Sequence, residues 1–168
     1  GPYLALEPAL AVVVDDGAGR PVGYGLAAPD TAAFDARCER EWWPQARRRH
    51  PRTPPSSDAE AALLARLHDG PRRPGVLDTH PSHLHVDLLP EVQGTGWGRA
   101  VVAELQRRLA VAGSPGVHWR VSRRNARALA FYARLGATVL REDEAVVCFG
   151  ARLAPGMSAG AAGHSVRA

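Results

Sequence analysis

At 168 residues, the chain is long enough to bury one substantial core but too short for a second full domain. All 21 of its basic residues are Arg, and the lack of Lys excludes P-loop nucleotide binding and Schiff-base catalysis, which both need a Lys amine. The net charge of +4 is spread along the chain, which argues against a nucleic-acid partner. No apolar run could cross a bilayer and no secretory leader is visible, so we expect a cytoplasmic protein with no membrane partner.

The first half of the chain predicts a β-hairpin followed by helices. Residues 10–15 and 22–28 are β-rich and flank a turn with glycines and a proline. A helix is expected from Asp30 or Thr31, with apolar residues at helical spacing, until Pro44 kinks or ends it. Ser57 and Glu60 have the spacing of a capping box that opens a short helix to about residue 68. Cys38 and Cys148 are expected to be buried free thiols.

The second half, from Ser82, predicts the order strand, helix, strand, helix, strand, strand. The helices are expected at 97–112 and 126–135, and the strands at 82–89, 117–122, 137–141 and 145–149. Residues 154–168 are small and aperiodic, so we expect a flexible tail there.

A glycine-rich turn stands between the strand at 82–89 and the helix that follows it. Gly94, Gly96 and Gly98 allow backbone amides to approach a ligand, and the helix N-terminus adds partial positive charge, which together favour a pyrophosphate. A dinucleotide fingerprint would need a third glycine at position 99, where this chain has Arg99. A glycine-rich turn without a ligand is the structural alternative.

Two motifs in this half resemble those of one protein superfamily. Gln93, Gly96 and Gly98 stand as QxxGxG, and residues Asn125, Ala128, Phe131, Tyr132 and Gly136 stand as NxxAxxFYxxxG. In this order, they resemble the coenzyme A pyrophosphate loop and the asparagine and tyrosine helix of GNAT acyltransferases. More narrowly, residues 82–153 are similar to the acetyltransferase-like C-terminal domain of O-GlcNAcases and its bacterial relatives.

The resemblance implies an α/β (α+β) fold, with a mixed, mostly antiparallel sheet flanked by helices and splayed beside residues 82–89 to admit acetyl-CoA. It implies one domain over 1–153, with a coenzyme A-binding core at 82–149 and a helical insertion on the acceptor side at 31–75. The superfamily usually has a strand and two helices before the first hairpin. We therefore expect an upstream element to be missing, which leaves the strand at 10–15 as an open edge that invites a homodimer.

The implied activity is N-acetyl transfer from acetyl-CoA directly to an amine in a ternary complex, without a metal. Tyr132 is the implied proton donor for the thiolate, and His85 or Asp87 could accept the proton of the amine. Trp42 or Trp43 would lie near the thioester, and Arg99, Arg123, Arg124 and Arg127 near the adenosine 3′-phosphate. The residues expected to contact the coenzyme are Leu88, Leu89, Gln93, Gly94, Thr95, Gly96, Trp97, Gly98, Arg99 and Asn125.

Two alternatives remain open at this level. One is a non-catalytic module that binds coenzyme A or a protein. The other is a metal-dependent enzyme, because His83, His85 and Asp87 alternate along one strand and so share one face of it.

Overall fold

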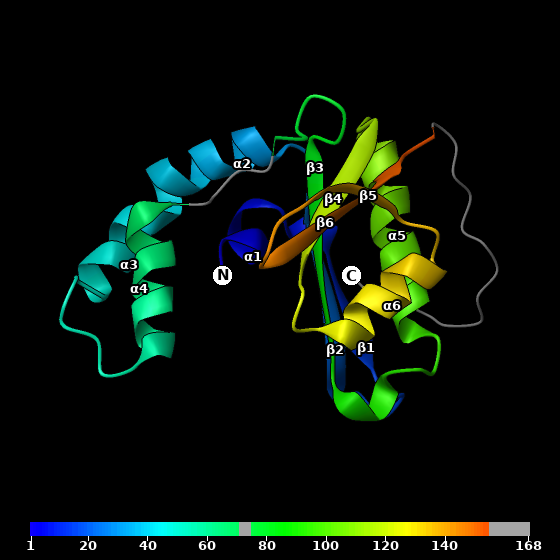
Figure 1. Ribbon diagram of the computed structural model, residues 1–168, viewed down its shortest axis with the longest axis horizontal. Coiled ribbons are helices and arrows are strands. Elements are labelled where there is room, and N and C mark those ends of the chain that lie inside the picture. Colours follow the sequence, from blue (N-terminus) through cyan, green and yellow to red (C-terminus); the bar gives the residue numbers. More distant parts are fainter. Residues whose placement is uncertain (71–74, 155–168) are drawn as a thin grey trace.

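The computed structural model describes residues 1–70 and 75–154. Within these residues, six strands form one sheet in the order β1-β2-β3-β4-β6-β5 (Figure 1). The strands are β1 (Ala11–Asp15), β2 (Pro21–Ala28), β3 (Ser82–Leu88), β4 (Gly116–Ser122), β5 (Thr138–Glu142) and β6 (Val146–Arg152). Neighbouring strands are antiparallel except β3 and β4, which are parallel. The expected mixed, mostly antiparallel sheet is confirmed.

The two parallel strands separate soon after they meet. Their register contains two pairs, Ser82 with Val117 and His83 with His118, although both strands continue for several residues. Beyond these pairs, the backbone groups of β3 that face β4 have no ladder partner there. The sheet therefore opens between β3 and β4, where the splay was expected.

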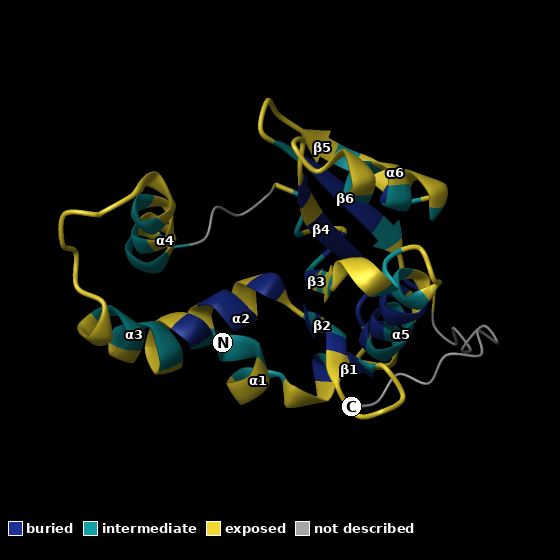
Figure 2. Ribbon diagram, turned by 90° about the horizontal axis from the view of Figure 1, so that it is seen from below, coloured by how far each residue is buried: buried dark blue, intermediate teal, exposed yellow. Residues whose placement is uncertain are grey.

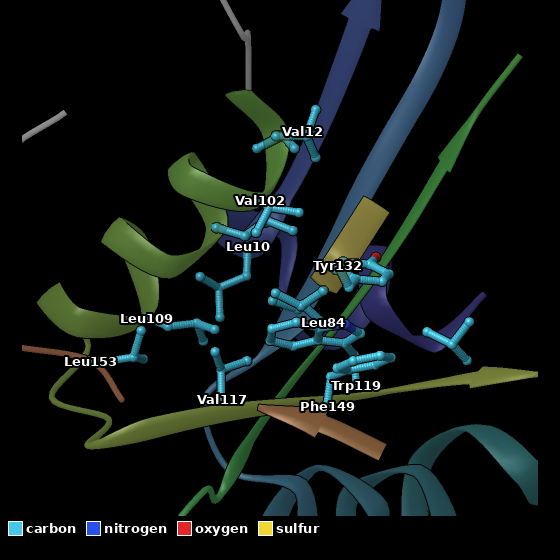
Figure 3. Close-up of a cluster of buried hydrophobic side chains, with 14 of the residues drawn as sticks. Leu10, Val12, Leu84, Val102, Leu109, Val117, Trp119, Tyr132, Phe149 and Leu153 are labelled. Atoms are coloured by element: carbon cyan, nitrogen blue, oxygen red, sulfur yellow. The ribbon is translucent and has the colours of Figure 1, made fainter. Parts of the chain in front are cut away.

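The main core lies between this sheet and two helices, α5 (Trp97–Val111) and α6 (Ala126–Arg134). Val101, Leu105 and Leu109 recur at helical spacing along α5 and are fully buried against the sheet. Figure 3 shows part of this core, in which Trp119 and Phe149 of the sheet meet Tyr132 of α6. Because α5 begins at the opening of the sheet, the core fixes the position of its N-terminus there.

The opposite face of the sheet carries α1 (Pro2–Leu6) and the helical insertion. The insertion consists of α2 (Thr31–Arg37), the π-helix η2 (Cys38–Trp42), α3 (Trp43–Arg49) and α4 (Asp58–Asp69). Between α1 and β1, the 3-10 turn η1 (Pro8–Leu10) instead places Leu10 in the main core with α5. A second small core joins Ala28 of β2 to Phe34 and Cys38, with Tyr3, Leu6 and Trp43 packed around it. Figures 1 and 2 show that α3 and α4 extend away from the sheet, and their residues are mostly exposed or half-buried.

The helical insertion departs from regular α-helix just before Pro44. The Trp43 amide donates to the Cys38 carbonyl, a five-residue step that defines η2, and α3 then carries Pro44 in its first turn. Pro44 has no backbone N–H to donate, which explains why the regular hydrogen-bonding pattern changes at this point. The helix was expected to kink or end at Pro44; its hydrogen-bonding pattern changes at this point, and it does not end but continues to Arg49. At the next helix, Ser57 caps α4 by accepting from the Glu60 amide, as expected.

Most predicted strands and helices end within one or two residues of their observed bounds, and β6 runs three residues further. Cys38 and Cys148 are buried and free, as predicted. None of the described helices has the length and apolarity needed to cross a membrane. The predicted tail lies outside the described residues from position 155 onward, and so do residues 71–74 of the predicted insertion.

Candidate active site

The opening between β3 and β4 is the geometric centre of the candidate site. Leu89, just after β3, donates its amide to Val22 of β2 at 2.9 Å. Amides alternate in direction along a strand, so those of Leu88 and Val86 point to the other side, toward the opening. Of the two residues expected to pair with the pantetheine arm, Leu88 is thus placed for it, and the Leu89 amide is already engaged.

The glycine-rich turn leads from β3, through the 3-10 turn η3 (Pro90–Val92), into α5. Gly94 has a φ of 87° and Gly96 a φ of 101°, in the left-handed region that a side chain would strain. Gly96 is the N-cap residue of α5, and no side chain of the described residues caps this helix. The first helical bond runs from the Ala100 amide to the Gly96 carbonyl, so the amides of Gly98 and Arg99 have no partner within the helix. This is the arrangement that binds phosphate groups at helix N-termini.

The third glycine has a different role, because it lets the two helices meet. A Cβ atom at Gly98 would lie 3.0 Å from Cζ of Phe131 on α6, closer than ordinary contact. The first turn of α5 therefore packs closely against α6 at Phe131. From α6, Arg127 reaches within 3.9 Å of the position of a Cβ on Gly94, which places its guanidinium beside the glycine turn.

Three of the residues that are expected to contact the coenzyme have polar side chains that bond within the protein. The Gln93 amide group donates to the Leu88 carbonyl at 2.8 Å, and the Thr95 hydroxyl donates to the Val92 carbonyl at 2.6 Å. Asn125 caps α6 by accepting from the Ala128 amide at 3.0 Å. These bonds fix the shape of the turn and the start of α6. They leave the backbone amides of the α5 N-terminus as the groups available to a phosphate.

Tyr132 lies in the core beneath the opening, with its ring centroid 5.0 Å from that of Trp119 (Figure 3). Burial is the main cause that raises the pKa of Tyr132 to about 12, and the negative charge of Asp87 raises it further. In the part of the chain that the structure describes, the Tyr132 hydroxyl has no hydrogen-bond partner, and its oxygen atom is not fully buried. The phenol is thus protonated at neutral pH and has a hydrogen bond to give.

The indole N–H of Trp119 is a second unpaired donor in the same cluster. Trp119 is 4% exposed, and its Nε1 is buried without an acceptor in the described residues. Leaving a buried donor unpaired costs about 1–3 kcal/mol. An acyl-coenzyme A molecule has the matching chemistry, because its diphosphate fits the amides of a helix N-terminus and its arm carries amide and thioester oxygens that accept hydrogen bonds. The residues at this opening therefore fit acetyl-CoA.

On the face of the sheet opposite α5, three side chains form a hydrogen-bonded group beside the opening. The Asp87 Oδ2 atom accepts from the Tyr24 hydroxyl at 2.7 Å and bonds His85 Nε2 at 2.9 Å. Tyr24 and Asp87 are register partners in β2 and β3. His85 and Asp87 could be predicted from the sequence but Tyr24 could not, since only the strand register shows which residue of β2 faces Asp87.

His83 shares this face but is held apart from the group. Thr31 donates its hydroxyl to the Pro81 carbonyl and so accepts from His83 Nδ1 at 2.8 Å, while the Tyr3 hydroxyl donates to His83 Nε2 at 2.7 Å. Burial, mainly, lowers the pKa of His83 from 6.5 to about 4. Both ring nitrogens are occupied by α1 and α2, so His83 has none left to join His85 and Asp87 as a metal ligand. Among the described residues, no three His, Cys, Asp or Glu side chains are grouped to hold a metal ion.

The other residues singled out in the sequence lie further from the opening or have other partners. Arg123 pairs with Glu142 at 2.6 Å and bonds the Asp143 carbonyl, which commits it to the β5–β6 hairpin. Trp43 packs in the second small core, and Trp42 precedes it at the end of η2. Of the four arginines expected near a 3′-phosphate, Arg127 has its guanidinium beside Gly94, and Arg99 lies in the first turn of α5.

Comparison with known proteins agrees with this arrangement. The model of the family described as FR47-like protein matches residues 81–146. The crystal structure of SsHAT is 39% identical, with a TM-score of 0.82, and the match covers 91% of this chain and 77% of SsHAT. Naa20 of Chaetomium thermophilum, solved with a bisubstrate analogue, has 21% identity and a TM-score of 0.52, covering 89% of this chain and 68% of its own. The structure of yncA from Salmonella typhimurium, solved with acetyl-CoA, has 15% identity and a TM-score of 0.50, and the match covers 90% of this chain and 69% of yncA.

The last two similarities concern the fold alone, whereas SsHAT is similar in sequence over most of both chains. The family match spans β3, the glycine turn, α5, β4 and α6, which are the elements that surround the opening. The chain thus belongs to the GNAT superfamily of acetyltransferases.

Proposed function

We infer that the chain is an N-acetyltransferase that moves the acetyl group of acetyl-CoA directly to an amine in a ternary complex. One observation carries this proposal: the sheet opens between β3 and β4, with a phosphate-binding turn on one face and the His85, Asp87 and Tyr24 group on the other. Naa20 with a bisubstrate analogue and yncA with acetyl-CoA support a coenzyme on this fold.

The coenzyme would be held by backbone groups rather than by a charged pocket. The backbone amides of Gly98 and Arg99, in the first turn of α5, and the guanidinium of Arg127 are suited to the diphosphate. The Leu88 and Val86 amides, which face the opening, are suited to the amides of the pantetheine arm, as when a strand is added to a sheet. When bound, acetyl-CoA supplies a thioester carbonyl that an amine can attack.

His85 is the proposed base, and Asp87 positions it. Because Asp87 is the acceptor at His85 Nε2, the proton of the neutral ring sits on Nε2 and the lone pair is on Nδ1. Nδ1 takes one proton from the incoming ammonium, directly or through water. The neutral amine then forms the C–N bond, the C–S bond breaks, and the amide nitrogen loses a second proton. The products are an acetylated amine, the free thiol of coenzyme A and one proton released to solvent.

Tyr132 is the proposed partner of the leaving sulfur. Its pKa of about 12 lies well above the value of about 8.5 that is usual for a thiol, so complete transfer of its proton to the thiolate would be uphill. The phenol instead stabilises the developing thiolate with a hydrogen bond. The second proton of the amine then neutralises the sulfur, directly or through solvent.

The test is acetyl transfer by the purified chain to a panel of primary amines, with free thiol and the mass of the product measured together. We expect thiol release that depends on the amine and matches the amount of acetylated product. His85→Gln and Asp87→Asn should reduce transfer and leave acetyl-CoA binding intact, whereas His68→Gln, on exposed α4, should change neither. Binding of acetyl-CoA without transfer to any amine would instead identify a non-catalytic coenzyme-binding module.

A further inference from the structure

A surface groove lies beside the proposed base, on the face of the sheet opposite α5. It has a volume of about 790 Å³ and runs over β1 and β2 between α1 and the end of β3. Strand register brings Val13, Tyr24 and Asp87 into one row across the sheet. Side chains directly opposite one another in antiparallel strands share a face, so one edge of the groove is Asp87, which bonds His85. We call this surface the acceptor groove.

The walls of the acceptor groove are apolar although they are exposed. Leu4 is 63% exposed and Val13 44%, and Tyr24 and Leu89 are also counted among the exposed apolar side chains. Of the seven large apolar side chains that are exposed in the described residues, these four line the groove. Exposed apolar side chains gathered in one place, rather than scattered, are typical of a binding surface.

The groove also has one fixed negative charge. Asp87 is its lining carboxylate, and its partners in the described residues are Tyr24 and His85, with no Arg among them. A cation that enters the groove therefore meets an acidic group that no guanidinium neutralises. Apolar walls with a carboxylate at the end next to the opening match a molecule with an ammonium group on an apolar body.

We propose that the acceptor groove binds the hydrocarbon part of the acceptor, and that the acceptor is a primary amine on an alkyl or aromatic body. This inference rests on the proposed acetyl transfer. The ammonium group lies beside Asp87 and gives its proton to His85, while the body lies along β2 against Val13 and Leu4. Amines with long polar bodies, such as polyamines or lysine in a polar peptide, lack a counterpart for these walls.

The test is the specificity constant kcat/KM for straight-chain amines from ethylamine to hexylamine. We expect it to rise roughly three- to fourfold per methylene, the usual gain for burying one such group. Hexylamine and 5-aminopentan-1-ol form a matched pair of nearly equal length, and the hydroxyl at the far end should lower kcat/KM. Val13→Asp should abolish the increase of kcat/KM with chain length, and the milder Val13→Thr should reduce it in part. Val111→Asp, on the exposed end of α5, is the matched control and should preserve the series.

Transfer to amines with a kcat/KM that does not depend on chain length would overturn the proposed role of the groove but would be consistent with the proposed function. Transfer to a lysine peptide of polar sequence in preference to hexylamine would also overturn it. A stable dimer that Val13→Asp dissociates would show that a second copy fills the groove, and would overturn it as well. Failure of transfer to every amine, with acetyl-CoA still bound, would instead refute the proposed function.

Discussion

Single side chains at the opening have roles that burial and hydrogen bonding define. Tyr132 has a pKa of about 12 and a hydroxyl without a partner in the described residues, so it can give a hydrogen bond throughout the neutral and mildly alkaline range. The coenzyme thiolate is the charged acceptor that the proposed function supplies. The pH profile of acetyl transfer should therefore contain no step from Tyr132 below about pH 10.

Tyr132→Phe should lower kcat and leave acetyl-CoA affinity almost unchanged. A hydrogen bond to a charged group contributes about 1.5–3 kcal/mol, so we expect kcat to fall about 10- to 100-fold. Steady-state kinetics and calorimetry on the same samples check the two halves of this prediction. Full activity in the variant would show that Tyr132 only packs against Trp119 and Phe149.

His83 makes stability depend on acid. Its pKa is about 4 in the folded chain against 6.5 ordinarily, so between these values the unfolded state binds more protons. Stability contributed by neutral His83 is thus fully present above about pH 6.5 and is lost as pH falls toward 4, by about 3 kcal/mol in all. Urea unfolding at pH 7 and pH 4.5 measures this loss.

His83→Gln should be less stable at pH 7 and yet lose less stability on acidification, because Gln does not titrate. Part of the loss should remain, since burial also lowers the pKa of His118. His68→Gln removes an exposed His from α4 and should keep the full wild-type loss. Equal losses in the wild type and His83→Gln would contradict the role assigned to His83.

Sequence could identify the residue types of the site but not their partners. The spacing of Gln93, Asn125 and Tyr132 was sufficient to predict the motifs. It could not show that Gln93 and Asn125 bond within the protein, because a side-chain amide suits a ligand and a helix cap equally well. Tyr24 had no signal of its own, since its importance comes from the register of β2 against β3.

At the scale of elements, the site depends on how closely α5 and α6 approach. Gly98 permits this approach, because a Cβ there would meet Phe131 at 3.0 Å. Gly98→Val should destabilise the fold by about 1–3 kcal/mol through overpacking and weaken acetyl-CoA binding. Adding Phe131→Leu should restore part of the stability, which thermal unfolding of the single and double variants would measure. If the stability losses of Gly98→Val and Phe131→Leu were additive in the double variant, residues 98 and 131 would not be in energetically important contact.

Arg127 links α6 to the glycine turn that precedes α5. Arg127→Gln should weaken acetyl-CoA binding about 10-fold or more, because a charge-assisted hydrogen bond is lost, and the loss should shrink at high salt. Arg134→Gln is the matched control, since it removes the same charge from the last turn of the same helix. Calorimetry at two salt concentrations gives both values, and an equal loss in the two variants would point to net charge rather than to contact.

The helices and strands were largely predictable because their apolar residues recur with the period of each element. The exceptions have local causes. The π-helix at Cys38–Trp42 keeps apolar residues four apart, so periodicity does not distinguish it from α-helix. The short helix α1 is held by contacts of Tyr3 with Phe34 and His83, which are distant in sequence.

At the scale of the whole molecule, the sheet consists of two halves that share little backbone pairing. The half β1–β2–β3 carries His85 and Asp87, and the half β4–β6–β5 lies under Tyr132. Two register pairs join them. Bound acetyl-CoA would add contacts across this junction.

Acetyl-CoA should therefore stabilise the chain against heat. At a concentration of 100 times Kd the gain is about 2.7 kcal/mol, which corresponds to roughly 5–10 °C in Tm for a domain of this size. Hydrogen exchange should slow most at Val86 and Leu88, whose amides face the opening. Slower exchange confined to residues far from β3 would contradict the proposed position of the coenzyme.

Sequence had less to say about the acceptor side. The motif order predicted the coenzyme half, and the helices at 31–68 were expected to form part of the acceptor wall. In the structure, α2 reaches the sheet near the start of β3, through Thr31, while α3 and α4 extend away from it (Figure 2). The direction in which a helical pair extends depends on a few contacts such as these, which no local pattern contains.

The opening has one more consequence, which concerns unwanted association. A free strand edge is normally a hazard, because any extended polypeptide can pair with it and start aggregation. The free edge of β3 lies inside the sheet, in a wedge that narrows to the pairing of His83 with His118. A neighbouring protein would have to insert a strand, with side chains on both faces, between β3 and β4. A thin molecule that carries its own amides meets no such obstacle, so the wedge protects the edge from other chains and keeps it available to a small ligand.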